Sequence, residues 1–222
     1  PEGKSWAEDR QEKPLSAFRK YATVPVINME SAMGHPCQAL ADLVTIRERM
    51  DPRGKDFVLA WAPHVKALPV AVPQSAAEMA VLAGMNLTIL RPEGYDLDDS
   101  VMRRLSRGCA ERGTRLRVTD DREGAFAGAH VVYAKAWGSL KDYGAPPARD
   151  PALRARWTVA ERDMLRTDDA LFMHCLPVRR NLVAADGVLD GPGSVIIDQA
   201  ENRLHAAKAL LLRLLAPEAC HA

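Results

Sequence analysis

The alternation of short apolar runs with helical segments is the feature that most limits how this chain can fold. Apolar runs occur at 24–28 (VPVIN), 56–62 (DFVLAWA), 87–90 (LTIL), 116–118 (LRV), 130–137 (HVVYAKAW), 170–174 (ALFMH) and 194–198 (SVIID). Helical patterns lie between or after them, at 35–50, 74–83, 98–112, 122–127 and 199–215. Such alternation is typical of an α/β fold. We predict a doubly wound, mostly parallel sheet with helices on both faces, as in Rossmann-like proteins.

Composition permits such a core and argues against several classes of function. Hydrophobic residues make up 47% of the 222 residues, the net charge is +1, and aromatic residues make up 5%. This balance speaks against a nucleic-acid-binding surface. No apolar run reaches the roughly 20 residues that span a bilayer. The cysteines Cys37, Cys109, Cys175 and Cys220 form no Cys-x-x-Cys pair. We therefore expect reduced thiols in a cytoplasmic protein, with no metal site.

Residues that follow the predicted strands are candidates for a binding site, because ligands of parallel sheets bind at the carboxyl ends of the strands. Several of these residues carry groups that bind anions and carboxylates. They are Glu30, His35, His64, Lys135, Cys175, Arg179, Arg180 and Arg203. The sequence thus predicts a site for small anionic molecules.

Each candidate also has a purely structural interpretation. His35 precedes Pro36 and could simply begin a helix, although free N–H groups at a helix start also bind anions. Gln38 lies one turn further on the same side. Cys175 could be a packed core thiol. Arg179 could belong to a solvated surface pair.

Three motifs occur in an order that resembles the aspartate/ornithine carbamoyltransferase family. They are HPCQALADL, HCLPVRRN and ENRLHAAKALL. VINMES, VVYAKAWG and HCLPVRRN resemble more narrowly the branch that acts on N-acetylornithine or N-succinylornithine. The family's Ser-x-Arg-Thr-Arg phosphate-binding stretch is absent from the sequence. We therefore expect residues 1–50 to be the end of the carbamoyl-phosphate domain with a connecting helix, and 51–198 to be the amino-acid-binding domain. Residues 199–222 would form a C-terminal helix that returns to a missing first domain.

The resemblance implies transfer of a carbamoyl group from carbamoyl phosphate to the δ-amine of an N-acylornithine, without a cofactor or metal. It assigns His35, Gln38 and Arg203 to the carbamoyl group, and Cys175 and Leu176 to the carbamoyl group and the attacking amine. His35, Arg203 and Cys175 would be the catalytic residues. The acylornithine would contact Glu30, His64, Lys135, Leu176 and Arg179. The resemblance further implies a homotrimer for the full-length protein, with no nucleic-acid or membrane partner.

The resemblance also implies a knot, in which residues 66–73 pass through a loop bounded by about residues 118 and 138. Two other functions within the family stay open: a plain ornithine carbamoyltransferase, and a truncated relative that binds an amino acid without catalysis. A dinucleotide-dependent oxidoreductase is disfavoured, because the chain has no glycine-rich turn between a strand and a helix.

Overall fold

The structure, a computed structural model, describes residues 5–145 and 150–216. Its sheet has the strand order β3-β2-β1-β4-β5 and all its pairings are parallel. The strands are β1 (Asp56–Trp61), β2 (Asn86–Leu90), β3 (Leu116–Thr119), β4 (Val131–Lys135) and β5 (Leu171–Met173). The central strand β1 is paired on both sides, from Asp56 opposite Asn86 and from Phe57 opposite Val131. The predicted fold class is confirmed.

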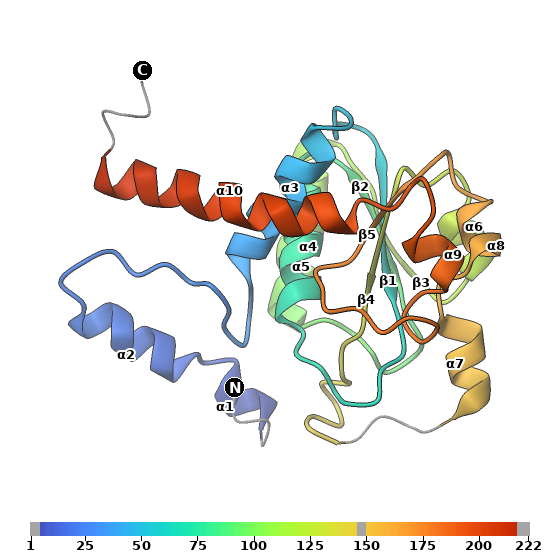
Figure 1. The fold of residues 1–222 in the computed structure, drawn as a ribbon. Helices are drawn as coiled ribbons and strands as arrows, with labels where there is room; N and C mark the ends of the chain where they lie inside the picture. Colours follow the sequence, from blue (N-terminus) through green and yellow to red (C-terminus); the bar gives the residue numbers. More distant parts are fainter. Residues whose placement is uncertain (1–4, 146–149, 217–222) are drawn as a thin grey trace.

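Helices cover both faces of this sheet (Figure 1). One side carries α3 (Pro36–Arg47), α4 (Ala71–Leu82), α5 (Asp99–Arg112) and the start of α10 (Ile196–Leu215). The other carries α6 (Arg122–Phe126), α7 (Pro151–Trp157), α8 (Glu161–Met164) and α9 (Asp186–Leu189). With both faces covered, the central strands are buried, and Phe57, Leu59 and Val132 are fully inaccessible to solvent, whereas the edge strand β3 keeps Arg117 and Val118 exposed. Two short N-terminal helices, α1 (Trp6–Asp9) and α2 (Lys13–Tyr21), lie outside these layers.

Local sequence explains where several helices begin. The side chains of Asp98, Asp121 and Asp150 each accept a hydrogen bond from a backbone N–H in the first turn of α5, α6 and α7. His35 does the same for α3, where Pro36 occupies the first helical position. Helix α5 ends at Gly113, whose positive φ of 67° is favourable for glycine.

Two predicted strands are wrong. Residues 24–28 form no strand, and Val24 is 69% exposed, because the segment runs outside the layers and has no strand beside it (Figure 1). Residues 194–198 make only an isolated bridge, Ser194 to Phe172, before α10 begins at Ile196. The short helices α7, α8 and α9 were not predicted, since four to seven residues are too few to show a helical period.

The knot stays a prediction. The two segments that it involves do touch, because the Gly138 amide donates a hydrogen bond to the Leu68 carbonyl at 2.8 Å.

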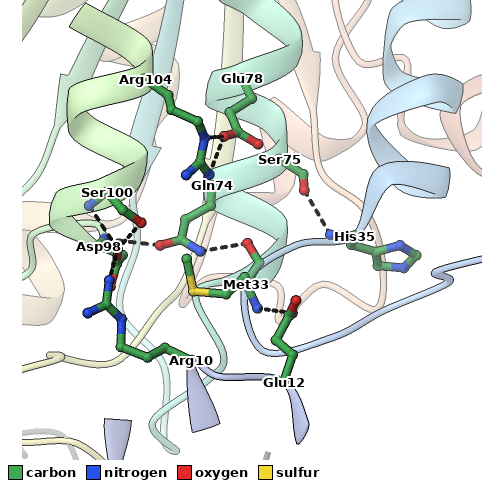
Figure 2. A network of polar contacts seen from close by, with 10 residues as sticks. All are labelled: Arg10, Glu12, Met33, His35, Gln74, Ser75, Glu78, Asp98, Ser100 and Arg104. Atoms are coloured by element: carbon green, nitrogen blue, oxygen red, sulfur yellow. Dashed lines mark hydrogen bonds and ion pairs between the residues drawn. The ribbon is translucent and has the colours of Figure 1, made fainter. Parts of the chain in front are cut away.

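A polar network fastens the N-terminal helices to the α/β body (Figure 2). Asp98 receives Trp6 Nε1 at 2.8 Å and Arg10 Nη2 at 2.9 Å, in addition to the backbone of Ser100. Gln74 bridges two separate segments: its Nε2 donates to the Met33 carbonyl at 2.7 Å and its Oε1 accepts the Asp98 amide at 3.0 Å. One buried carboxylate thus anchors both α1 and α5.

Asp98→Ala is expected to lower the free energy of unfolding by about 2–3 kcal/mol at pH 7, since it removes a helix cap and a buried hydrogen-bond acceptor. Burial alone would raise the pKa of Asp98, but hydrogen bonds from Ser100 and Trp6 hold it below its usual value. The stabilisation is therefore present above the unfolded pKa of about 3.9 and is lost as pH falls through the lower folded pKa.

Urea unfolding at pH 7 and pH 3 measures this effect. The difference between Asp98→Ala and the unsubstituted protein should shrink at pH 3. Asp99→Ala, at the exposed neighbouring position, serves as the control and should change stability by less than about 0.5 kcal/mol. Equal losses in the two variants would contradict the role given to Asp98.

Candidate functional site

The strand order places a candidate site between β1 and β4. The chain runs outward from β1 to β2 and β3, then returns to β4 and continues to β5. The order therefore reverses between β1 and β4, which is where ligands bind in open α/β sheets. His64 follows β1, Lys135 ends β4, and Cys175 and Leu176 follow β5.

His35, Gln38 and Arg203 meet at the edge of this site. Arg203 lies on α10 and its Nη1 donates to Gln38 Oε1 at 2.5 Å. The same Nη1 is 3.3 Å from His35 Nε2. His35 Nδ1 accepts the Gln38 amide at 3.3 Å, and Ser75 Oγ receives the His35 amide at 2.7 Å. Burial, followed by the nearby charge of Arg203, lowers the pKa of His35. The ring is therefore neutral at pH 7.

Cys175 and Lys135 lie together with Tyr133 beside the end of β5. Burial raises the pKa of the Cys175 thiol, while the charge of Lys135 and hydrogen bonds with Tyr133 and Lys135 oppose this shift. Burial and the charges of Lys135 and His64 lower the pKa of His174 to about 3. Lys135 therefore acts electrostatically on both residues, and Cys175 stays a protonated thiol.

Leu176 turns the chain sharply after β5. Its φ is 47°, in the left-handed region, and its amide donates to His174 Nδ1 at 3.0 Å. Leu176 lies beyond the end of β5 at Met173, so its carbonyl is outside the strand pairing of the sheet.

His64 and Arg179 form a pair. Arg179 Nε donates to His64 Nε2 at 3.0 Å, while His64 Nδ1 lies 3.1 Å from the Lys66 amide nitrogen and 3.2 Å from the Lys66 carbonyl oxygen. Burial lowers the pKa of His64. Arg180 points elsewhere: its guanidinium binds the carboxylates of Asp186 and Asp190, and it closes the loop before α9. Only the first of the two neighbouring arginines faces the site.

Glu30 stands apart from the rest. It is exposed, and it lines a hollow with Glu8, Glu12 and Lys13 at the N-terminal helices. Its charge nevertheless raises the pKa of His35, against the larger effects of burial and Arg203. Glu30 therefore lies within electrostatic range of the site and at its rim.

Sequence reasoning missed four buried polar residues beneath the site: Asp42, Ser75, Tyr133 and Gln199. A signal existed for Asp42, which lies four residues after Gln38 and hence on the same side of α3. In the parts of the chain that are described, no three His, Cys, Asp or Glu side chains are grouped to hold a metal ion. No described helix is both long and apolar enough to cross a membrane.

Comparisons with known proteins give the family. Residues 70–214 match the Asp/Orn binding domain of aspartate/ornithine carbamoyltransferases, and residues 7–48 match the carbamoyl-P binding domain of the same enzymes. The chain belongs to the aspartate/ornithine carbamoyltransferase family. The expectation that the carbamoyl-phosphate domain is missing needs correction, because residues 7–48 match part of it.

Individual relatives are similar over most of the chain. The N-acetylornithine carbamoyltransferase of Xanthomonas campestris is 44% identical over 97% of this chain and 65% of its own length. The N-succinylornithine carbamoyltransferase of Bacteroides thetaiotaomicron is 39% identical over 93% of this chain and 61% of its own length. A crystal structure of acetylornithine transcarbamylase complexed with acetylcitrulline has a TM-score of 0.89 at 43% identity, covering 96% of this chain and 66% of that one. These matches confirm the resemblance to the N-acylornithine branch, and the chain spans just under two thirds of the length of these relatives.

Lys135→Met tests the electrostatics of the site. Removing the positive charge should raise the pKa of Cys175 further and slow its alkylation by iodoacetamide at pH 8 about 3- to 10-fold, because the thiolate is the reactive form. Peptide mass spectrometry follows Cys175 separately from Cys37. Lys141→Met, at an exposed position in the loop after β4, is the matched control. An unchanged or faster reaction of Cys175 would contradict this arrangement.

Proposed function

We propose that this protein transfers the carbamoyl group of carbamoyl phosphate to the δ-amine of an N-acylated ornithine, with N-acetyl-L-ornithine the preferred acceptor. The products are the N-acylcitrulline and phosphate, as a step of arginine biosynthesis. One observation carries the proposal: the donors on His35 and Arg203 lie within electrostatic range of Lys135, which also contacts Cys175 at the turn after β5. The activities named for the relatives in the N-acylornithine branch support it.

The carbamoyl end uses two converging donors. Because His35 Nδ1 accepts the Gln38 amide, the neutral ring carries its proton on Nε2, which faces Arg203 Nη1 at 3.3 Å. Two donors cannot hydrogen-bond to each other, so both are available to one oxygen placed between them. The carbonyl oxygen of carbamoyl phosphate fits this position. It gains negative charge as the amine attacks, and fixed donors stabilise such charge most strongly.

The amine end uses the turn after β5. The neutral δ-amine attacks the carbonyl carbon and a C–N bond forms; the C–O bond to phosphate breaks, and phosphate leaves with the electron pair and takes up the proton that the nitrogen loses. The Leu176 carbonyl would accept a hydrogen bond from the attacking amine and orient its lone pair. Cys175 has a raised pKa and is not a thiolate, so it flanks the reaction as a neutral thiol and no covalent intermediate is needed.

The acceptor's carboxylate would bind Lys135, and its acyl-amino end would contact His64, Arg179 and Glu30. Arg and Lys side chains suit carboxylates. His64 holds Arg179 through the hydrogen bond at 3.0 Å, so the guanidinium is oriented before substrate arrives. A homotrimeric assembly in the cytoplasm, with no nucleic-acid or membrane partner, belongs to the same proposal.

Assays of the full natural chain with carbamoyl phosphate and ornithine, N-acetylornithine or N-succinylornithine in parallel test the proposal. We expect the highest kcat/KM with N-acetylornithine. A preference for free ornithine would identify ornithine, and not an N-acylornithine, as the acceptor. Failure to form a ureido product from any of the three amines would overturn the proposed function.

Arg203→Ala should lower kcat by roughly 100-fold or more, the scale of losing one donor to a developing oxyanion. Arg213→Ala, at an exposed position on the same helix, should leave kcat unchanged. Wild-type turnover by Arg203→Ala would remove this residue from the catalytic centre.

A further inference from the structure

A fully buried carboxylate, Asp42, lies beneath the site and joins α3 to α10. Its Oδ1 accepts Gln38 Nε2 at 2.7 Å and Gln199 Nε2 at 2.6 Å. Its Oδ2 is buried and has no hydrogen-bond partner among the described residues. No ion pair with a described residue neutralises it. A buried charge without a direct ionic partner is costly.

The carboxylate decides which way two amide groups point. An ionised Asp only accepts hydrogen bonds, whereas a Gln amide has a donor end and an acceptor end. Both glutamines must therefore turn their NH₂ groups toward Asp42. Their oxygens then point away: Gln38 Oε1 accepts Arg203 Nη1 at 2.5 Å, and Gln199 Oε1 accepts the His174 amide at 2.9 Å.

Each of these two oxygens accepts a hydrogen bond from a residue at one end of the proposed site: Arg203 at the carbamoyl end and His174 at the amine end. Arg203 is one of the two donors that face the carbamoyl oxygen, and His174 directly precedes the turn that carries Cys175 and the Leu176 carbonyl. We propose that Asp42 is a positioning residue: its negative charge fixes the amide orientation of Gln38 and Gln199, and thereby sets Arg203 and the turn after β5 for carbamoyl transfer. This inference rests on the proposed function.

Charged and titratable groups face Asp42 from each element around it. They are Arg203 on α10, Tyr133 on β4 and Cys175 after β5. Burial raises the pKa of Asp42 to about 6, although the Gln38 and Gln199 amides, the nearby Tyr133 hydroxyl and Arg203 act in the opposite direction. Asp42 is therefore charged at pH 7–8 and neutral below about pH 6.

Loss of the Asp42 charge should therefore leave stability unchanged or higher while it lowers activity. A folded pKa raised above the unfolded value means that ionisation of Asp42 disfavours the folded state as pH rises from about 4 to about 6, and this cost persists above pH 6. Asp42→Asn removes the buried charge and replaces one acceptor oxygen with an NH₂ donor, so that a glutamine oxygen as well as an NH₂ group can turn toward it, as with the protonated acid. It should unfold at a temperature no lower than that of the unsubstituted protein at pH 8.

The test compares Asp42→Asn with Asp163→Asn in the full natural chain. Asp163 is also a buried carboxylate, but it binds Arg122 at the opposite face of the sheet. Asp42→Asn should lower kcat about 10- to 100-fold at pH 8, the scale of misplaced reacting groups, with KM for N-acetylornithine changed less than about 3-fold. Asp163→Asn should unfold at a lower temperature with kcat unchanged.

The pH profile gives the second readout. In the unsubstituted protein kcat should fall as pH drops through about 6, and this acidic limb should be absent in Asp42→Asn. An acidic limb that persists in the variant would assign it to another group, such as His35, and overturn the role of the Asp42 charge. Wild-type kcat in Asp42→Asn would overturn the proposal as well.

NMR of protein labelled with ¹⁵N-glutamine separates this proposal from the proposed function. The side-chain amide signals of Gln38 and Gln199 should shift together with a midpoint near pH 6 and should not titrate in Asp42→Asn. Absence of carbamoyl transfer by the unsubstituted protein would reject the function, and the NMR titration would still report on the amide positions. If the amide signals of Gln38 and Gln199 do not respond to pH, the charge of Asp42 does not set their orientation, and the proposal is rejected whether or not the protein transfers a carbamoyl group.

Discussion

The site depends on the contact between α3 and α10, two helices whose contacting residues are about 150 positions or more apart in the chain. The seam between them is polar and buried rather than apolar. Asp42 receives Gln199, Asn202 donates to Thr45 at 3.0 Å and to Glu48 at 2.8 Å, and Arg203 donates to Gln38. Apolar packing would tolerate rotation or sliding of one helix along the other, whereas these bonds are directional. The seam therefore fixes the register of α10 on α3, and that register brings Arg203 to His35.

The parallel sheet supplies the second half of the site. Because β1 and β4 are neighbours and the strand order reverses between them, the loops after these strands diverge and leave room for a ligand. Gln199 connects the two halves: its NH₂ group contacts Asp42 on α3 and its oxygen receives the backbone of His174 after β5. A displacement of α10 would consequently disturb the turn with Leu176 as well as Arg203, so the two halves of the site are mechanically linked.

The fold was predictable because the buried strands of a parallel sheet appear as continuous apolar runs. The two wrongly predicted strands, 24–28 and 194–198, have a common physical cause: hydrophobic β-branched residues also occur where no partner strand is available. VPVIN is exposed in this structure, and the apolar residues of SVIID begin a helix. Because of the second error the predicted C-terminal helix began at Gln199, whereas α10 begins at Ile196 and Gln199 lies at the end of its first turn. The site residues of HPCQ and HCLPVRRN follow from motifs, whereas Asp42 and Tyr133 required knowledge of which helix and strand lie beneath them.

Cationic side chains surround the two neutral histidines of the site, His35 and His64. Burial, followed by Arg203 and Lys135, lowers the pKa of His35, and burial, followed by Arg179 and Lys135, lowers that of His64, so each imidazole stays neutral at pH 7 and keeps one donor and one acceptor. A protonated His35 would lose the acceptor that receives the Gln38 amide, and the geometry of α3 would change with it. The cations thus serve two purposes, because they suit anionic substrates and also hold the histidines in a single protonation state. Asp42 is the opposite case: it is the buried group whose charge is opposed by burial and supported by only two amides, a nearby hydroxyl and a nearby guanidinium. The pKa values of these histidines are thus shifted down and that of the carboxylate beneath them is shifted up, so lowering the pH from 8 neutralises Asp42 near pH 6.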